Sequence, residues 1–376
     1  MQHKYPFFKV GIIGGGQLAK MMTQEAKKMG FWVGVLDPTP SSPAGQLADR
    51  QIVADFYNPE ALKTLVEESD VATYDIEHVN TQALKEESLR RKVFPSPEVL
   101  EIIQDKLRQK ETLSRGGIPV PSFLPEVSHK ALRELGSPAI WKARFGGYDG
   151  KGVAKIEKAE DLASLPQKEA FLEELVTIEK ELAVVVARSR SGEIVAYPVV
   201  EMTFHPANHI CDQVFAPARI SEETARKAQE IAQKCVTLLQ GVGVFAVEMF
   251  LDQSGKLLVN EIAPRPHNSG HFTIEACVTS QFEQHLRAIC GLPLGSTQLL
   301  TPAVMVNLLG EKGAEGVPVV EGLEEALTIQ GVSFHFYGKA QVRPFRKMGH
   351  VTIVDTDLEA AIRKAQRIKE ILHIRS

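Results

Sequence analysis

Two carboxylates on neighbouring apolar segments are the side chains in this sequence best suited to chemistry. Glu248 lies in the run 243–251, and Glu261 lies in the run 257–263. An ionised carboxylate in an apolar strand is costly unless a cation or hydrogen-bond donors offset its charge. Two strands that each present one carboxylate suit Mg²⁺, which usually shares its ligand shell with phosphates when few carboxylates hold it. The pair therefore indicates nucleotide chemistry.

A glycine-rich loop earlier in the chain is a candidate phosphate-binding element. Lys142 ends a short apolar strand, and Lys151 lies among the glycines at positions 146, 147, 150 and 152. The loop is not a Walker A motif, because neither Ser nor Thr follows Gly150-Lys151 and no long helix opens after it. A glycine-rich hairpin can instead fold over a triphosphate as a lid, using its backbone N–H groups. A flexible surface loop is the alternative.

The turn Gly14-x-Gly16-x-x-Ala19 lies between a predicted strand and a predicted helix. Asp37 ends the next predicted strand, where a dinucleotide-binding protein places its ribose-binding acid. The same turn suits other phosphate ligands, because a helix N-terminus offers unsatisfied N–H donors. Dinucleotide binding, another ligand and a purely structural turn all remain open on this pattern.

Composition describes an ordinary globular chain. Its 376 residues are 44% hydrophobic and 24% charged, and the net charge of -4 argues against a surface for nucleic acid. The four cysteines form no CxxC pair, which is typical of free thiols in a reducing compartment. No run of 18 apolar residues predicts a membrane span, and no signal peptide is evident, so we expect a cytoplasmic protein without a membrane partner.

The order of predicted elements indicates a mixed α/β and α+β architecture. Strands and helices alternate through residues 1–95, which predicts a Rossmann-like, doubly wound parallel sheet. Ser96 and Pro97 can then open one long helix that reaches Arg115. Residues 96–300 read as a second domain, with a lid at about 120–180, and residues 301–376 read as a small αβ domain.

Further motifs follow the order and spacing of the ATP-grasp superfamily. They are Lys106, Lys142, Glu173 to Val176 with Glu181, Glu248 and Asn260-Glu261. Motifs that carry a closer resemblance within this superfamily are Gly14-Gly-Gly-Gln-Leu18, Glu77-His-Val79, Phe145-Gly-Gly-Tyr-Asp-Gly-Lys-Gly152, Ala263-Pro-Arg-Pro-His-Asn-Ser-Gly-His271, Tyr337-Gly-Lys339 and Arg346-Lys-Met-Gly-His350. Over essentially its whole length the chain resembles the 5-(carboxyamino)imidazole ribonucleotide synthases of purine biosynthesis. These enzymes use ATP and bicarbonate to form carboxyphosphate, which carboxylates the exocyclic amine of 5-aminoimidazole ribonucleotide.

The resemblance implies a role for each motif. Glu248 and Glu261 would hold Mg²⁺ (two ions) or Mn²⁺. The implied ATP-binding residues are Lys106, Lys142, Gly147, Tyr148, Asp149, Gly150, Lys151, Gly152, Glu173, Glu174, Leu175, Val176, Glu181, His205, Asn260 and Glu261. The residues implied to bind the aminoimidazole ribonucleotide are Gly16, Gln17, Leu18, Glu77, Tyr148, Asp149, Lys339 and Arg346. Arg265, His267 and Asn268 would hold bicarbonate or carboxyphosphate, and Lys339 and Arg346 complete the implied catalytic set.

The resemblance also implies a homodimer, and it is incomplete at two places. Ala19-Lys20 stands where the family usually has Gly-Arg, and Met202 stands where an Asn is usual, which leaves the role of His205 open. Other readings remain: a formate-dependent glycinamide ribonucleotide transformylase, a nicotinamide-dependent oxidoreductase, or a nucleotide-binding regulator without turnover. Zinc binding by the HxxxH pairs at 205–209 and 267–271 is opposed by Pro206 and Pro266, which disfavour a continuous helix there.

Overall fold

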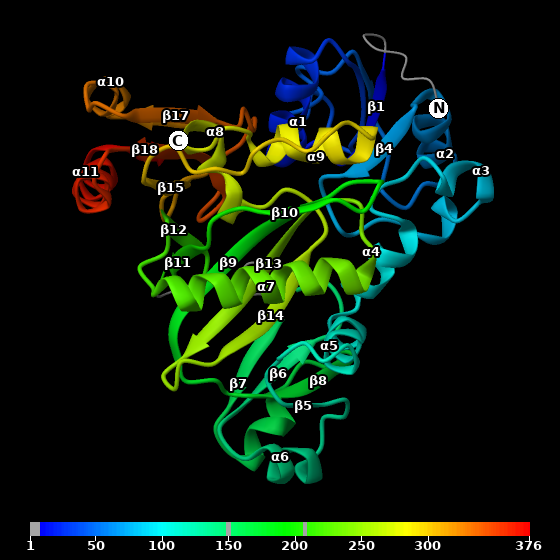
Figure 1. Ribbon diagram of the computed structural model, residues 1–376, viewed down its shortest axis with the longest axis vertical. Coiled ribbons are helices and arrows are strands. Elements are labelled where there is room, and N and C mark those ends of the chain that lie inside the picture. Colours follow the sequence, from blue (N-terminus) through cyan, green and yellow to red (C-terminus); the bar gives the residue numbers. More distant parts are fainter. Residues whose placement is uncertain (1–7, 148–151, 206–208) are drawn as a thin grey trace.

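The computed structural model describes residues 8–147, 152–205 and 209–376. In Figure 1 a parallel sheet lies at the top, a large sheet crosses the middle, and a small antiparallel sheet lies at the bottom. No helix within these residues is both long and apolar enough to cross a membrane.

The first sheet is parallel, with strand order β3-β2-β1-β4. Every residue of its central strand β1 after Lys9 is buried, as expected for a strand that is covered on both faces. Helix α1 packs on one face and α2 on the other, which confirms the predicted doubly wound sheet. The elements are β1 (Lys9–Ile13), α1 (Gln17–Lys28), β2 (Trp32–Leu36), β3 (Arg50–Ile52), α2 (Pro59–Glu68), β4 (Val71–Tyr74), the 3-10 helix η1 (Gln82–Leu84) and α3 (Glu87–Arg90).

The single helix predicted up to Arg115 is wrong, because the chain forms two helices that meet at Asp105. They are α4 (Pro97–Gln104) and α5 (Lys106–Arg115). Asp105 has extended backbone, and its carboxylate accepts hydrogen bonds from the backbone N–H groups of Leu107 and Arg108, so it caps α5. Arg144 also binds this carboxylate, with Nη2 2.5 Å from Oδ2. The break makes Lys106 the first residue of a new helix.

The small sheet is antiparallel, with strand order β5-β8-β6-β7. Its β6–β7 hairpin contains the glycine-rich loop, and Lys142 on β6 pairs with Val153 on β7 and Phe171 on β8. The elements are β5 (Phe123–Leu124), α6 (His129–Leu135), β6 (Ala139–Ala143), β7 (Val153–Ile156), the 3-10 helix η2 (Ala159–Ser164) and β8 (Ala170–Glu174).

The largest sheet has the order β14-β13-β9-β11-β12-β15-β18-β17, with β10 paired to β9. Strands β15, β18 and β17 come from the region predicted as a separate C-terminal domain, yet they continue this sheet beyond β12. Backbone hydrogen bonds therefore join strands from before and after residue 300. The domain boundary at this residue stays a prediction. The strands are β9 (Ile178–Arg188), β10 (Ile194–Ala196), β11 (Val200–Phe204), β12 (Cys211–Ala216), β13 (Gly243–Asp252), β14 (Leu257–Ala263), β15 (Ala303–Leu309), β17 (Val332–Phe336) and β18 (Lys347–Val354).

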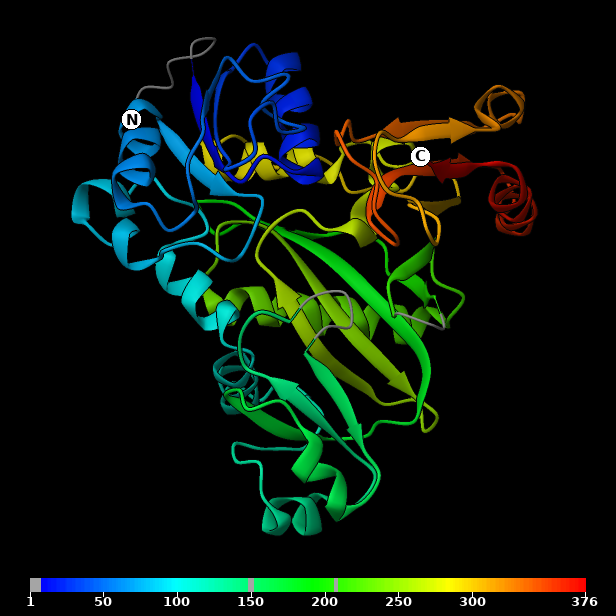
Figure 2. The same ribbon diagram turned by 180° about the vertical axis from the view of Figure 1, so that it is seen from behind.

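Helix α7 (Glu222–Leu239) covers one face of this sheet, as Figure 1 shows. Val247 and Met249 of β13 pack under it in the hydrophobic core. Because side chains alternate along a strand, Glu248 points to the opposite face, which Figure 2 presents toward the viewer. The remaining elements are the 3-10 helix η3 (Asn268–Gly270), α8 (Thr273–Ala276), α9 (Gln281–Cys290), β16 (Val319–Glu321), α10 (Leu323–Leu327), α11 (Leu358–Ile371) and β19 (His373–Arg375).

Candidate active site

The two carboxylates identified in the sequence face each other across the β13–β14 ladder. Glu248 is the register partner of Glu261, and Met249 is the partner of Val259. Asn260 is therefore the extra residue of a β-bulge, which bends a strand and redirects its side chains. The bulge places the Asn260 side chain beside the carboxylate pair.

Two lysines from different elements reach this group. Nζ of Lys106 lies 2.5 Å from Oε2 of Glu261, and Nζ of Lys142 donates to Oδ1 of Asn260 at 3.0 Å. Lys106 reaches the site because α5 begins at that residue, and its backbone N–H donates to the carbonyl of Arg144 at 2.9 Å. The predicted lysines thus meet the predicted carboxylates.

The pKa values of the two carboxylates move in opposite directions. Burial raises the pKa of Glu248 above its usual range, and the carboxylates of Glu261 and Glu181 add to the rise. Burial by itself opposes ionisation of Glu261 too, but the ammonium groups of Lys106 and Lys142 more than offset it and lower that pKa. Ionisation is therefore disfavoured at Glu248 and favoured at Glu261.

A buried ion cluster lies behind Lys142. Glu173 of β8 pairs with Lys142 and with Lys110, whose Nζ lies 2.7 Å from Oε2 of Glu173. The side chains of Lys110 and Glu173 are only 3% and 2% exposed, and burial lowers the pKa of Lys110 to about 8. Lys110 also donates to the carbonyl of Asn260 at 3.0 Å, so the cluster fixes the bulge.

The segment implied to bind the base and ribose of ATP joins β8 to β9. The carboxylate of Glu174 accepts a hydrogen bond from the Ser122 backbone at 2.9 Å, so it is engaged within the small sheet. Leu175 is 40% exposed and offers an apolar surface, and Val176 follows it before β9 begins. Burial raises the pKa of Glu181 to about 7, and Lys142 lowers it in part.

The turn after β14 connects this site to the first sheet. Nη2 of Arg265 lies 3.0 Å from Oε1 of Glu77, and Nε2 of His267 lies 3.5 Å from Oε1 of Glu248. Nδ1 of His267 accepts from the Ser269 backbone N–H at 3.3 Å, so the proton of the neutral ring belongs on Nε2, which faces Glu248. Two residues predicted to hold bicarbonate therefore contact a residue predicted to bind the ribonucleotide and a residue predicted to hold the metal.

Asn268 is placed differently from the expectation that it holds bicarbonate. Its side-chain amide forms a reciprocal pair with that of Asn307, with donor–acceptor distances of 2.8 and 2.7 Å, and Asn307 also donates to the Cys211 carbonyl. Both amides are buried. In this arrangement Asn268 anchors the turn to β15 and β12.

The glycine turn of the first sheet is occupied by carboxylates of the protein itself. The backbone N–H of Gly15 donates to Asp37 at 2.8 Å, and those of Gly16 and Ala19 donate to Asp75 at 2.6 and 3.0 Å. Asp37 therefore holds the turn, and the donor that it engages is a backbone N–H of the turn itself. Gln17 and Leu18 open α1 beside this turn.

The residues predicted near the C-terminal end form one loop before β18. Nζ of Lys339 donates to the Lys347 carbonyl at 2.6 Å, and Arg346 donates to the Gln341 carbonyl at 2.7 Å. Lys347, the first residue of β18, helps to lower the pKa of Glu248, although burial and the neighbouring carboxylates outweigh it. His205 also contacts the loop, with its ring centroid 6.0 Å from that of Phe345.

Lys20 joins the first sheet to the same loop. Its Nζ donates to the carbonyls of Phe336 and Tyr337, both at 3.0 Å. The departure from the usual arginine at this position therefore preserves a cation that ties α1 to the C-terminal region.

Part of the predicted phosphate lid lies outside the described residues, namely Tyr148, Asp149, Gly150 and Lys151. The two ends of the loop lie close together: a Cβ atom built on Gly152 meets Cα of Gly147 at 3.2 Å, and Gly152 has a φ of +81°. A side chain at Gly152 is disfavoured by both the conformation and the close approach.

Comparisons with known proteins identify the family of this chain. The model of the ribonucleotide synthetase preATP-grasp domain matches residues 7–104, that of the ATP-grasp domain matches 111–282, and that of the phosphoribosylaminoimidazole carboxylase C-terminal domain matches 303–364. An N5-carboxyaminoimidazole ribonucleotide synthase of Bacillus subtilis is 43% identical over 358 residues, which are 93% of this chain and 92% of that protein. The chain belongs to the N5-carboxyaminoimidazole ribonucleotide synthase family.

Solved structures with a similar fold belong to the same family. The N5-carboxyaminoimidazole ribonucleotide synthetase of Thermotoga maritima is 59% identical, with a TM-score of 0.92, over 98% of this chain and 100% of that one. The synthase of Aspergillus clavatus, solved with ADP and 5-aminoimidazole ribonucleotide, is 36% identical, with a TM-score of 0.89, over 97% and 98%. As a member of the N5-carboxyaminoimidazole ribonucleotide synthase family, the protein is an ATP-dependent ligase with an ATP-grasp domain.

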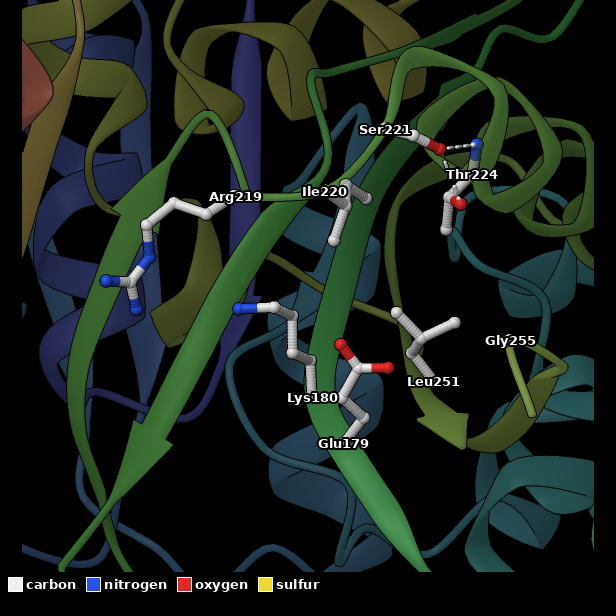
Figure 3. A pocket seen from close by; sticks show the side chains of 8 residues that line it. All are labelled: Glu179, Lys180, Arg219, Ile220, Ser221, Thr224, Leu251 and Gly255. Atoms are coloured by element: carbon white, nitrogen blue, oxygen red, sulfur yellow. Dashed lines mark hydrogen bonds between the residues drawn. The ribbon is translucent and has the colours of Figure 1, made fainter. Parts of the chain in front are cut away.

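A cavity of about 490 Å³ lies elsewhere in this synthase fold, on the side of the sheet that α7 covers (Figure 3). Lys180 and Arg219 line it, and both bind the buried carboxylate of Glu201, at 3.0 and 2.6 Å. Because Glu248 points to the opposite face, we do not assign this cavity to the ligase site.

Three residues that hold the synthase site together were not predicted from the sequence: Lys110, Gln109 and Asn307. Gln109 brackets Ile262, accepting from its N–H at 2.9 Å and donating to its carbonyl at 3.3 Å. Helical spacing was the available signal for two of them, because positions 106, 109 and 110 share one face of a helix. Nothing in the sequence marks Asn307, which lies 39 residues beyond its partner.

Proposed function

We propose that the protein carboxylates 5-aminoimidazole ribonucleotide, using ATP and bicarbonate and releasing ADP and phosphate, in the purine pathway that the family serves. The observation that carries this proposal is the ion pair between Arg265 and Glu77. Arg265 follows the carboxylate Glu261 in the chain, whereas Glu77 lies in the loop after β4 of the first sheet. A phosphoryl-transfer site and an acceptor site that share this contact suit a ligase that uses ATP to join bicarbonate to a ribonucleotide.

The carboxylate pair fits Mg²⁺. Glu248 and Glu261 offer only oxygen ligands, which Mg²⁺ prefers. Burial, together with the carboxylates of Glu261 and Glu181, raises the pKa of Glu248, and a bound cation would favour its ionised form. Among residues 8–147, 152–205 and 209–376, no group of three or more His, Cys, Asp and Glu side chains is arranged to hold a metal, so phosphate oxygens and water would complete the shell. The bound ion would neutralise phosphate charge during transfer.

The side chains of the protein supply the remaining chemistry. Lys106 and Lys142 face the position of the phosphates and offset negative charge as the γ-phosphoryl group moves to bicarbonate. Arg265 and His267 lie where the resulting carboxyphosphate would form. The amine of the ribonucleotide then attacks the carboxyl carbon of carboxyphosphate. The bond between this carbon and the phosphate oxygen breaks, and the amine proton leaves with the phosphate. Exclusion of water matters, because water competes with the amine for carboxyphosphate.

Initial-rate measurements of ADP release with Mg²⁺ test the proposal. ADP release coupled to a carboxylated product should require 5-aminoimidazole ribonucleotide and bicarbonate together. A rate that is unchanged when bicarbonate is omitted, or that formate and glycinamide ribonucleotide support instead, would contradict it and favour the transformylase reading. The homodimer implied by the resemblance stays a prediction, which sedimentation equilibrium would test.

A further inference from the structure

Besides Asn268, a second buried side chain, Gln281, holds the turn that faces Glu248. The backbone N–H of His267 donates to Oε1 of Gln281 at 2.9 Å, and Nε2 of Gln281 donates to the His267 carbonyl at 2.7 Å. These opposite partners fix the orientation of the amide. Nε2 also lies 3.2 Å from Nδ1 of His271, so Gln281 contacts both ends of the turn.

The packing around this amide leaves little freedom. A Cβ atom built on Gly270 would lie 2.3 Å from Oε1 of Gln281, so a side chain at position 270 collides with the amide. The backbone N–H of Gln281 donates to Oγ1 of Thr273 at 2.9 Å, and Thr273 donates to the Gly270 carbonyl at 2.6 Å. The residue is fully buried, so water does not replace these bonds.

Gln281 also connects the turn to the acceptor side. It is the first residue of α9, and Phe282, Leu286 and Ile289 of this helix share a hydrophobic core with α1. Helix α1 begins at Gln17, a residue expected to bind the ribonucleotide. One rigid helix therefore relates the position of His267 to that of the second substrate.

We propose that Gln281 is a positioning residue that fixes the His267 turn relative to α1. Carboxyphosphate formed near Glu248 and Glu261 is then attacked by the amine of the ribonucleotide before water attacks it. This inference rests on the proposed function and assigns a role to a side chain outside the set predicted to bind the substrates. Loosening the turn should then separate ATP consumption from carboxylation, because misplacement by about 1 Å costs up to about 100-fold in rate.

The test compares Gln281→Met with Gln284→Met. Gln284 lies on the same helix, is equally buried, and brackets Gly295 with bonds of 2.8 and 2.7 Å to its carbonyl and N–H. Each variant thus loses one amide that brackets a backbone group. For each protein we would measure the melting temperature, the KM for ATP, and the ratio of ADP released to carboxylated product.

We expect similar losses of melting temperature in both variants and an unchanged KM for ATP. Only Gln281→Met should raise the ratio of ADP to product, by about tenfold or more, and lower the kcat of carboxylation by about 10- to 100-fold. A ratio equal to that of Gln284→Met would overturn the inference. The proposed function is judged separately, by the dependence of wild-type turnover on bicarbonate and the ribonucleotide.

A Gln281→Glu variant keeps the inference testable if Gln281→Met does not fold. An ionised carboxylate accepts from His267 N–H but repels the His267 carbonyl, whereas a protonated one restores both bonds. Burial favours the neutral acid. The ratio of ADP released to carboxylated product should therefore fall toward the wild-type ratio as the pH is lowered from about 8 to about 6. A ratio of ADP to product equal to that of wild type at every pH would overturn the inference.

Discussion

Replacing Glu173 by Gln tests whether the buried ion cluster is needed for stability. The change leaves Lys110 and Lys142, whose side chains are 3% and 12% exposed, without their shared carboxylate. Breaking a buried pair in this way costs about 3–5 kcal/mol. The loss in the free energy of unfolding has an upper limit, because Lys110 can release its proton instead of remaining charged without a partner. Deprotonating a lysine of ordinary pKa 10.5 at about pH 7 costs about 5 kcal/mol.

The pH dependence of this loss has a definite sign. In the wild type the pKa of Lys110 is about 8, and removing Glu173 lowers it further. Between the new pKa and about 8, folded wild type keeps a proton on Lys110 that the folded variant lacks, whereas both unfolded chains hold it. The stability of the variant therefore rises with pH in this window and that of wild type does not. The difference in free energy of unfolding between wild type and variant should shrink by about 1.4 kcal/mol between about pH 7 and about pH 8, and should then stay constant.

Urea unfolding followed by the fluorescence of Trp141 is a suitable assay, because Trp141 is buried in the same small sheet as Glu173. A Trp32→Phe background removes the other tryptophan. Glu174→Gln is the control: its carboxylate accepts one bond from the Ser122 backbone, so its loss should be about 1 kcal/mol or less. A deficit for Glu173→Gln below about 1 kcal/mol, or one that does not change with pH, refutes the reasoning.

Three further outcomes are expected. Glu261→Gln should lower kcat by about 100-fold or more, yet cost at most about 1 kcal/mol in urea unfolding, because the carboxylate is 40% exposed; an active variant would exclude Glu261 from the mechanism. Mg²⁺ affinity, measured calorimetrically with ADP, should rise as the pH increases from about 6 to about 8, because burial raises the pKa of Glu248 and the metal must displace that proton; Glu248→Gln should abolish the dependence. Lys20→Met removes two bonds to the loop before β18 and should raise the KM for the ribonucleotide by about three- to tenfold without changing that for ATP; equal changes in both values would argue against the selective role.

The sequence patterns predicted the elements whose signals are local. Alternation of apolar strands and helices was sufficient for the doubly wound first sheet, and the spacing of Glu248 and Glu261 was sufficient for the carboxylate pair. The break at Asp105 was not predictable in this way, because apolar spacing continues across it. Arg144, a partner 39 residues away, binds Asp105 at the break.

Side-chain pairing set the limit for the site residues. Asn268 reads as a ligand in sequence because it follows Glu261 closely, but its amide is taken by Asn307 from another strand. Asp37 occupies the position of a ribose-binding acid, but Gly15 donates to it. In each case a distant or backbone partner decides what a polar side chain does, and spacing alone does not reveal that partner.

The carboxylates at the first glycine turn have a consequence for protein engineering. A dinucleotide-binding protein offers the helix N-terminus to a pyrophosphate, whereas here Asp75 already accepts from Gly16 and Ala19. An incoming pyrophosphate would meet a carboxylate rather than free donors. Converting this domain to a nicotinamide carrier would therefore have to begin with Asp75, however closely the glycine spacing matches, and removing Asp75 would also loosen the start of α1.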